Sequence, residues 1–221
     1  MIAENVATLK KTIKSADVTI VAVTKTQPAE RVRQAVGAGL SVLGENRVQE
    51  AAEKTGLLAD LAVDWHLIGH LQTNKAKQAV SLFSLIQSVD SLKLALEINR
   101  HAAAMNKVQD ILLQINVAAE ISKFGIEPAQ ASAVAAELET LPNVRLCGIM
   151  TIAPYFDQAE NTRPIFRQTR EIYDRIRSEL GCPEYFNRLS MGMTHDYLIA
   201  LEEGSNMIRI GSGILGERKN S

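Results

Sequence analysis

Short apolar segments alternate along the chain with longer segments in which apolar residues recur every three or four positions. The short segments are rich in Val, Ile and Leu, a composition typical of strands that are buried on both faces of a parallel sheet. Eight of them are predicted to be strands: 18–25, 40–45, 63–69, 82–89, 109–117, 144–152, 187–192 and 206–212.

The longer segments have the spacing of amphipathic helices. Pro28 and Pro128 suit the first turn of a helix, Thr73 suits an N-cap, and Gly204 suits a C-terminal stop. The predicted helices are 3–15, 28–39, 46–60, 73–81, 91–106, 128–141, 158–180 and 194–204.

Eight repeats of a strand followed by a helix favour a closed (β/α)8 barrel, the TIM barrel, with the helix at 3–15 as an addition before the first strand. An open, doubly wound sheet is the alternative. No long linker or low-complexity segment divides the chain, so we expect one domain over residues 1–221.

Charge and cysteine content narrow the classes of function. The 24 basic and 25 acidic residues nearly cancel, which argues against nucleic acid or an anionic membrane as the main partner. Two cysteines, Cys147 and Cys182, do not make a disulfide framework, and the polar N-terminal segment lacks the apolar core of a signal peptide. We therefore expect a cytoplasmic protein with no membrane span.

The loops after the seventh and eighth strands are rich in glycine and serine, including Ser190, Gly192, Gly211 and Ser212. In this fold those two loops are the usual phosphate site, because small residues let backbone N–H groups approach an anion. Either loop alone fits a tight turn equally well. The presence of both in the expected places favours phosphate.

Lys25 follows Val21 and Val23 at alternate positions of the first strand, so it is predicted to point into the mouth of the barrel. A desolvated lysine has a lowered pKa and reacts with aldehydes. A side chain that reaches solvent is the simpler interpretation of one lysine alone. Beside a phosphate site, Lys25 becomes a candidate for binding an aldehyde that carries a phosphate.

Two other polar residues lie on predicted strands. Arg209 faces the barrel and needs an acceptor, which is either a ring nitrogen of a bound heterocycle or a carboxylate such as Glu45. His66 and His70 are four residues apart on an extended strand, about 13 Å, too far to share a metal ion. A hydrogen-bonded histidine inside the barrel is the expectation for His66.

Several motifs together resemble the pyridoxal phosphate homeostasis proteins in order and spacing, from about residue 18 to residue 216. GEN-x-VQE, H-x-IG-x-LQ-x-NK and SMGM are the most specific of them. The segments are VAVTKTQP, GENRVQEAAEK, WHLIGHLQTNK, IQSVDS, NVAAEISKFGI, GIMTIAP and LSMGMTHDYLIALEEGSNMIRIGSGILG.

The resemblance implies the barrel of the alanine racemase N-terminal domain, with pyridoxal 5′-phosphate (PLP) held by Lys25 as an aldimine. It implies that Arg209 faces the pyridine nitrogen and that Asn46, His66 and Met150 surround the cofactor. Leu215 stands where the family usually has an aromatic residue, which affects packing more than phosphate binding. The residues implied in the phosphate loops are Ser190, Met191, Gly192, Met193, Gly211 and Ser212.

The family is regarded as a carrier or regulator of the vitamin B6 pool without established catalysis, so the resemblance implies a binding protein in PLP homeostasis, with transient contacts to PLP-dependent apoenzymes. A PLP-dependent racemase is the alternative, and it needs a second acid or base opposite the lysine. Of the four tyrosines, Tyr155, after the sixth strand, is the one placed to serve. The sequence shows no second domain of the racemase kind, so we expect a monomer.

Overall fold

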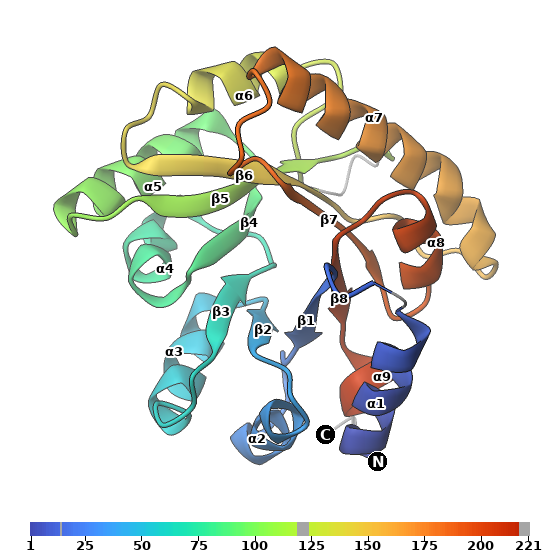
Figure 1. Cartoon of the computed structure of the whole chain (residues 1–221). Helices are drawn as coiled ribbons and strands as arrows, with labels where there is room; N and C mark the ends of the chain where they lie inside the picture. The colour runs from blue at the N-terminus through green and yellow to red at the C-terminus, as the bar shows by residue number, and fades with distance from the viewer. Residues whose placement is uncertain (14, 119–123, 217–221) are drawn as a thin grey trace.

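Eight parallel strands form a closed barrel in the order of the sequence (Figure 1). The computed structural model describes residues 1–13, 15–118 and 124–216. The predicted (β/α)8 barrel is therefore confirmed, and the open sheet is excluded. The strands are β1 Thr19–Val23, β2 Val42–Glu45, β3 Asp64–Leu67, β4 Leu85–Val89, β5 Gln109–Ile115, β6 Val144–Thr151, β7 Arg188–Met193 and β8 Met207–Ile210.

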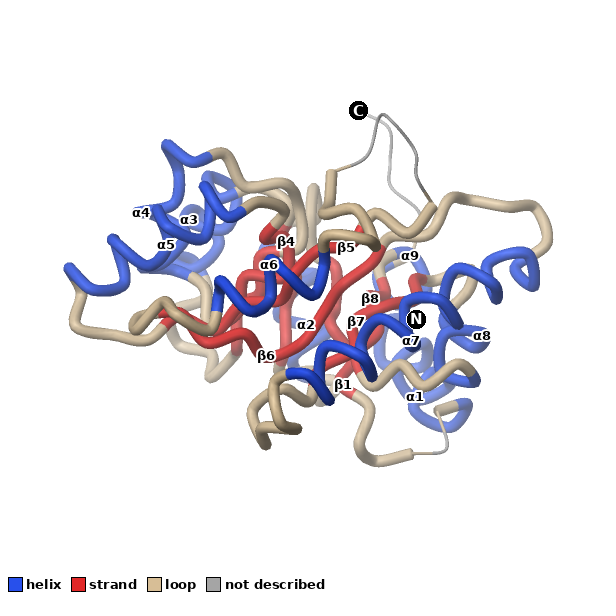
Figure 2. Tube along the Cα trace, turned by 90° about the horizontal axis from the view of Figure 1, so that it is seen from above, coloured by secondary structure: helices blue, strands red, loops and turns tan. Residues whose placement is uncertain are grey.

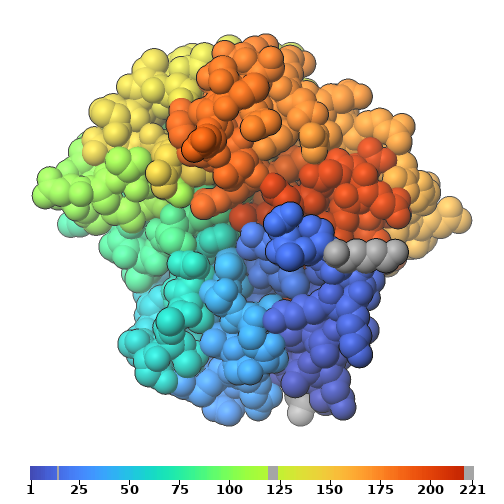
Figure 3. Space-filling view, in the orientation of Figure 1, coloured from blue at the N-terminus to red at the C-terminus, as the bar shows by residue number. Residues whose placement is uncertain are grey.

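The first and last strands close the barrel. In this pairing Val21 lies opposite Arg209, and Ala22 lies opposite Ile210. The N-terminal segment consequently lies against the C-terminal segment on the surface shown in Figure 3. The turn after β1 and the loop after β8 thus leave the barrel side by side.

Helices surround the strands on the outside, as Figure 2 shows. The helix α7 is held against the barrel by its apolar face. Phe166, Ile172 and Ile176 recur there at helical spacing and are buried. The helices are α1 Ile2–Thr12, α2 Ala29–Gly37, α3 Val48–Leu57, α4 Ala76–Leu82, α5 Leu92–Ala104, α6 Ala131–Leu138, α7 Arg163–Glu179, α8 Tyr197–Glu202 and α9 Ser212–Leu215, with short 3₁₀ turns η1 Thr73–Lys75 and η2 Ala159–Thr162.

Several predicted boundaries are wrong. Pro128 does not lie in the first turn of a helix, because α6 begins only at Ala131. Thr73 is not the N-cap of a helix, because a 3₁₀ turn occupies Thr73–Lys75 and α4 begins only at Ala76. The first strand ends at Val23 and not at Lys25, because the Gln27 N–H bonds the Thr24 carbonyl and closes a turn. Ser91, in contrast, caps α5 by accepting a hydrogen bond from the Leu94 N–H.

The barrel encloses an apolar cluster with no residue from the surrounding helices. Val21 is fully buried in it and Val23 packs against it, which confirms that these two side chains fill the barrel. Cys147 lies there as a packed, free thiol, and its burial raises its pKa to about 11. The members are Val21, Ile68, Leu85, Leu112, Cys147, Met150 and Met207, with Val23, Val42 and Ile152 beside them.

Within the described ranges, none of the helices combines the length and the apolar character needed to cross a bilayer.

Candidate cofactor site

Lys25 lies in the turn after β1 and is partly buried. Its neighbour Thr26 has a φ of 60°, a value that β-branched residues rarely adopt. Because β1 pairs with β8, this turn lies beside the loop that begins at Gly211. The structure therefore brings Lys25, Gly211 and Ser212 to adjoining loops at the carboxyl end of the barrel.

Two backbone N–H groups of the loop after β8 converge on the loop after β7. Gly211 N and Gly213 N lie 3.3 Å and 3.4 Å from the hydroxyl oxygen of Thr194. A Cβ at Gly213 would lie 3.0 Å from Ile210 Cγ2 and 3.1 Å from Thr194 Cγ2, so this close approach favours glycine. Converging N–H groups beside a hydroxyl fit a phosphate.

The loop after β7 is held by its own contacts. The Met193 N–H donates to Asp196 Oδ1 at 2.6 Å, and burial raises the pKa of Asp196. Gly192 has a φ of 93°, and a Cβ there would lie 2.6 Å from Ala200 Cβ. Gly192 thus allows α8 to approach β7, while Met191 is buried in the outer core. Of the four residues 190–193, only Met193 is exposed.

A chain of hydrogen bonds, here called the buried relay, crosses the barrel from β3 to β8. Arg209 Nη1 donates to Ser190 Oγ at 2.7 Å, and Ser190 Oγ donates to Gln87 Oε1 at 2.6 Å. Gln87 Nε2 therefore faces His66 Nδ1, 3.0 Å away. Arg209 Nη2 donates to the Thr151 carbonyl at 2.7 Å. The Ser190 hydroxyl is thus engaged with Gln87 and Arg209.

Burial sets the charge states along the buried relay. It lowers the pKa of His66 to about 3, aided by the nearby Arg188, so His66 is neutral at physiological pH and its Nδ1 accepts from Gln87. Burial also lowers the pKa of Arg209 to about 10, with Asp196 acting in the opposite direction. Arg209 consequently stays a cation.

The suggested ion pair between Arg209 and Glu45 is replaced by other contacts. Glu45 Oε1 lies 2.7 Å from Lys54 Nζ, under α3 on the outside of the barrel. Arg209 instead bonds Ser190 and Thr151. Its guanidinium is held in the barrel by neutral acceptors.

Asn46 follows β2, the strand that pairs with β1, at the carboxyl end of the barrel. It lines a cavity of about 220 Å³ together with Gly69 and His70. His70 stacks on Phe124 with ring centroids 3.6 Å apart, and its Nδ1 lies 2.9 Å from Asp90 Oδ2. The other lining residues are Ile68, Gln114, Ile115, Asn116, Phe124 and Ile152. Met150 is fully buried inside the barrel.

Gln87, Thr151 and Thr194 were not singled out by the sequence. Gln87 could have been found, because it is a long polar residue in a strand whose five residues are all buried. Thr194 directly follows the SMGM motif. The hydrogen bond from Arg209 to the Thr151 carbonyl could not be predicted from the sequence, because every residue has a backbone carbonyl.

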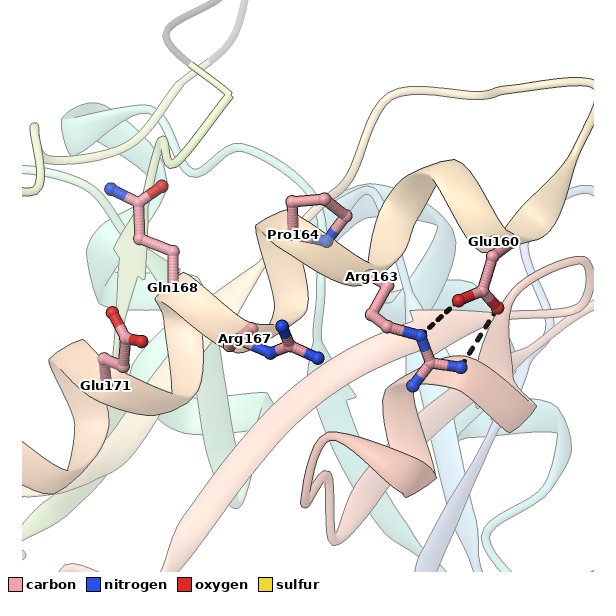
Figure 4. Close-up of a pocket in the computed structure, with 6 residues that line it drawn as sticks. All are labelled: Glu160, Arg163, Pro164, Arg167, Gln168 and Glu171. Carbon is pink, nitrogen blue, oxygen red and sulfur yellow. Dashed lines mark hydrogen bonds and ion pairs between the residues drawn. The ribbon is translucent and has the colours of Figure 1, made fainter.

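Larger hollows lie elsewhere on the surface. One of about 430 Å³ follows α7, where Arg163 bonds Glu160 (Figure 4) and both Arg163 and Arg167 pair with Glu203. Another, of about 650 Å³, lies between α1 and α8 and is lined by Ile13, Val18, Leu198 and Leu201 among others. Both lie against outer helices, whereas the smaller cavity beside Asn46 lies at the carboxyl ends of the strands, so hollow size alone does not identify the site.

Comparison with known proteins agrees with this geometry. The family model described as alanine racemase, N-terminal domain, matches residues 1–219. The pyridoxal phosphate homeostasis protein of Aquifex aeolicus is 45% identical over 195 residues, which cover 88% of this chain and 85% of that protein. PipY of Synechococcus elongatus, solved with PLP bound, is 37% identical with a TM-score of 0.89, over 98% of this chain and 100% of that chain.

An alanine racemase from Clostridium difficile shares the fold at greater distance. Its TM-score is 0.80 at 18% identity, and the match covers 100% of this chain but 56% of the racemase. At that identity the likeness concerns the barrel alone.

Proposed function

The chain belongs to the pyridoxal phosphate homeostasis proteins, a family with the alanine racemase N-terminal barrel, and on that premise we propose that it binds PLP at the mouth of the barrel. One observation carries the proposal. Lys25, the buried cation Arg209 and the converging N–H groups of Gly211 and Gly213 all lie along the seam between β1 and β8. The protein groups proposed to bind the aldehyde, the pyridine ring and the phosphate therefore lie side by side.

Each group has a distinct part in the proposed binding. Bound PLP supplies an aldehyde, which condenses with the Lys25 amine to form a C=N bond and release water. Arg209 faces the pyridine nitrogen, and Thr194 with Gly211, Ser212 and Gly213 surrounds the phosphate. Ser190 and His66 act through the buried relay. Asn46 lies at the edge of the mouth, Met150 closes its floor, and Met191, Gly192 and Met193 shape the loop.

We propose a binding protein in vitamin B6 homeostasis with no strong catalysis of its own. Arg209 stays charged beside the ring nitrogen, which keeps that nitrogen unprotonated and weakens the ring as an electron sink. Tyr155 is 76% exposed and lies against His195, with ring centroids 5.0 Å apart. It is therefore poorly held for an acid–base role. We also propose a cytoplasmic monomer that contacts apoenzymes transiently.

An absorption spectrum with added PLP tests the binding proposal. We expect a visible band that borohydride bleaches. After this reduction and proteolytic digestion, the cofactor should remain covalently attached to the peptide that contains Lys25. A protein that stays colourless and retains no PLP in equilibrium dialysis would overturn it. Racemisation of an amino acid by the yellow protein would favour the enzyme instead.

A further inference from the structure

A cluster of charged side chains beside Lys25 belongs to neither the mouth nor the buried relay. Lys54 of α3 directs its ammonium at three oxygens: Glu45 Oε1 at 2.7 Å, Glu50 Oε1 at 2.7 Å and the Thr24 carbonyl at 2.5 Å. Glu45 comes from the end of β2, and Glu50 precedes Lys54 by one helical turn. Glu45, Glu50 and Lys54 are here called the turn clamp. Through Lys54 the turn clamp bonds the carbonyl of Thr24, the residue before Lys25.

The turn clamp also bonds the residue after Lys25. The Thr26 N–H donates to Glu50 Oε1. The Thr24 hydroxyl donates to Glu45 Oε1 at 2.5 Å. The backbone on both sides of Lys25 is therefore bound to side chains that lie 20 or more positions further along the chain.

Burying the charged groups of the turn clamp under α3 carries a cost in desolvation free energy. Glu45 is fully buried and Lys54 nearly so, and buried ion pairs often contribute less than apolar residues of the same size. Glu45 Oε2 has no hydrogen-bond partner in the described part of the chain, and burial raises the pKa of this carboxyl against the bonds from Lys54 and Thr24. Packing alone does not account for the turn clamp.

The turn itself needs support. Thr26 has a φ of 60°, a backbone conformation that is unfavourable for a β-branched residue and persists only where surrounding contacts impose it. The bonds to the Thr26 N–H and the Thr24 carbonyl supply such contacts. They fix the direction in which the Cα–Cβ bond of Lys25 leaves the chain.

We propose that Glu45, Glu50 and Lys54 are positioning residues, which orient the Lys25 turn so that the Lys25 amine meets an aldehyde bound at the mouth. This inference rests on the proposed function. The amine nitrogen adds to the aldehyde carbon, the carbonyl oxygen leaves as water with two protons from the amine, and a C=N bond remains. The turn clamp touches none of the reacting atoms, so it governs the rate of this condensation and not the contacts to phosphate or ring.

The experiment separates condensation from binding. Stopped-flow absorbance follows formation of the Lys25 link with PLP. Equilibrium dialysis measures binding of pyridoxine 5′-phosphate, which carries an alcohol in place of the aldehyde and cannot condense. Glu50→Ala is the main variant because Glu50 is partly exposed, and Glu53→Ala, at an exposed position of the same helix, is its control.

Glu50→Ala is expected to slow condensation by about tenfold, which is less than the roughly hundredfold loss that a misplacement of about 1 Å can cause. Its affinity for pyridoxine 5′-phosphate should match that of the unaltered chain, and Glu53→Ala should match it in both measurements. Lys54→Met should slow condensation further. If Lys54→Met fails to fold, the condensation rate of Glu50→Ala tests the proposal by itself.

Two results would overturn the positioning role. One is a condensation rate in Glu50→Ala equal to that of the control. The other is a loss of analogue affinity as large as the loss of rate, which would make the turn clamp a general support of the site. An unaltered chain that binds neither PLP nor the analogue would overturn the proposed function, and the positioning role with it.

Discussion

Arg209 donates a 2.7 Å hydrogen bond to the hydroxyl of Ser190, a residue on the neighbouring strand of the barrel. That hydroxyl donates onward to Gln87, so Ser190 couples the guanidinium to the far side of the barrel. A contact of Ser190 with phosphate would require its one O–H donor, which is already given to Gln87. Ser190 is better understood as the support of Arg209.

Ser190→Ala should therefore affect both stability and cofactor retention. The change leaves a donor of Arg209 and the Gln87 carbonyl oxygen without their partner, which costs about 1–3 kcal/mol in the free energy of unfolding. Urea denaturation of the cofactor-free protein measures this cost. Ser212→Ala, at an exposed position, is the matched control and should unfold at the same urea concentration. Equal midpoints for both variants would contradict the relay.

Thr194→Val tests the phosphate site with little change of shape. Valine lacks the hydroxyl toward which the Gly211 and Gly213 N–H groups point. Loss of a hydrogen bond to a charged group costs about 1.5–3 kcal/mol, so affinity for PLP should fall by roughly tenfold or more. Equilibrium dialysis measures the change, and pyridoxal without its phosphate provides the control. If pyridoxal loses affinity equally, Thr194 does not bind the phosphate.

The barrel could be predicted because its strands are covered on both faces and read as uninterrupted apolar runs. α7 was equally clear, since Phe166, Ile172 and Ile176 repeat at helical spacing. The ends of elements were harder to place. The pattern of residues permits a strand as far as Lys25, whereas the turn there is held by the Gln27 N–H and by Lys54, which bonds the Thr24 carbonyl from 30 positions further along the chain.

The same limit applies to the candidate site. Lys25, Arg209 and Gly211 stand out because a polar residue or glycine at the end of an apolar strand is visible in the sequence. Gln87 is visible as a polar residue in a buried strand, but its role is not, because that role depends on Ser190, 103 residues away and across the barrel. Contacts between distant strands require the register of the closed barrel, which the sequence pattern does not contain.

Acid should destabilise the protein in part through His66. Its pKa is lowered from 6.5 to about 3 in the folded state, so the unfolded chain binds a proton that the folded chain does not between those values. Stability from this group is complete above pH 6.5 and falls as the pH drops toward 3, by at most about 1.4 kcal/mol per pH unit. Urea denaturation at pH 7 and pH 4.5 measures the loss.

His66→Gln isolates that contribution, because carboxylates elsewhere also add to acid denaturation. Glutamine keeps a polar side chain near Gln87 but does not titrate. The difference in unfolding free energy between pH 7 and pH 4.5 should be smaller in the variant than in the unaltered chain. Identical differences would show that His66 is not the neutral, buried group described here.

Lys25→Ala is the most direct test of the covalent link. The variant should lose the visible band, because no amine remains at the end of β1 to condense with the aldehyde. PLP should still bind, more weakly, through the phosphate and ring contacts. Lys25 is only partly buried, so the melting temperature of the cofactor-free protein should change little. Lys75→Ala, at a partly buried lysine in η1 after β3, is the control and should keep the band. A band that survives in Lys25→Ala and disappears in Lys75→Ala would assign the covalent link to Lys75 instead.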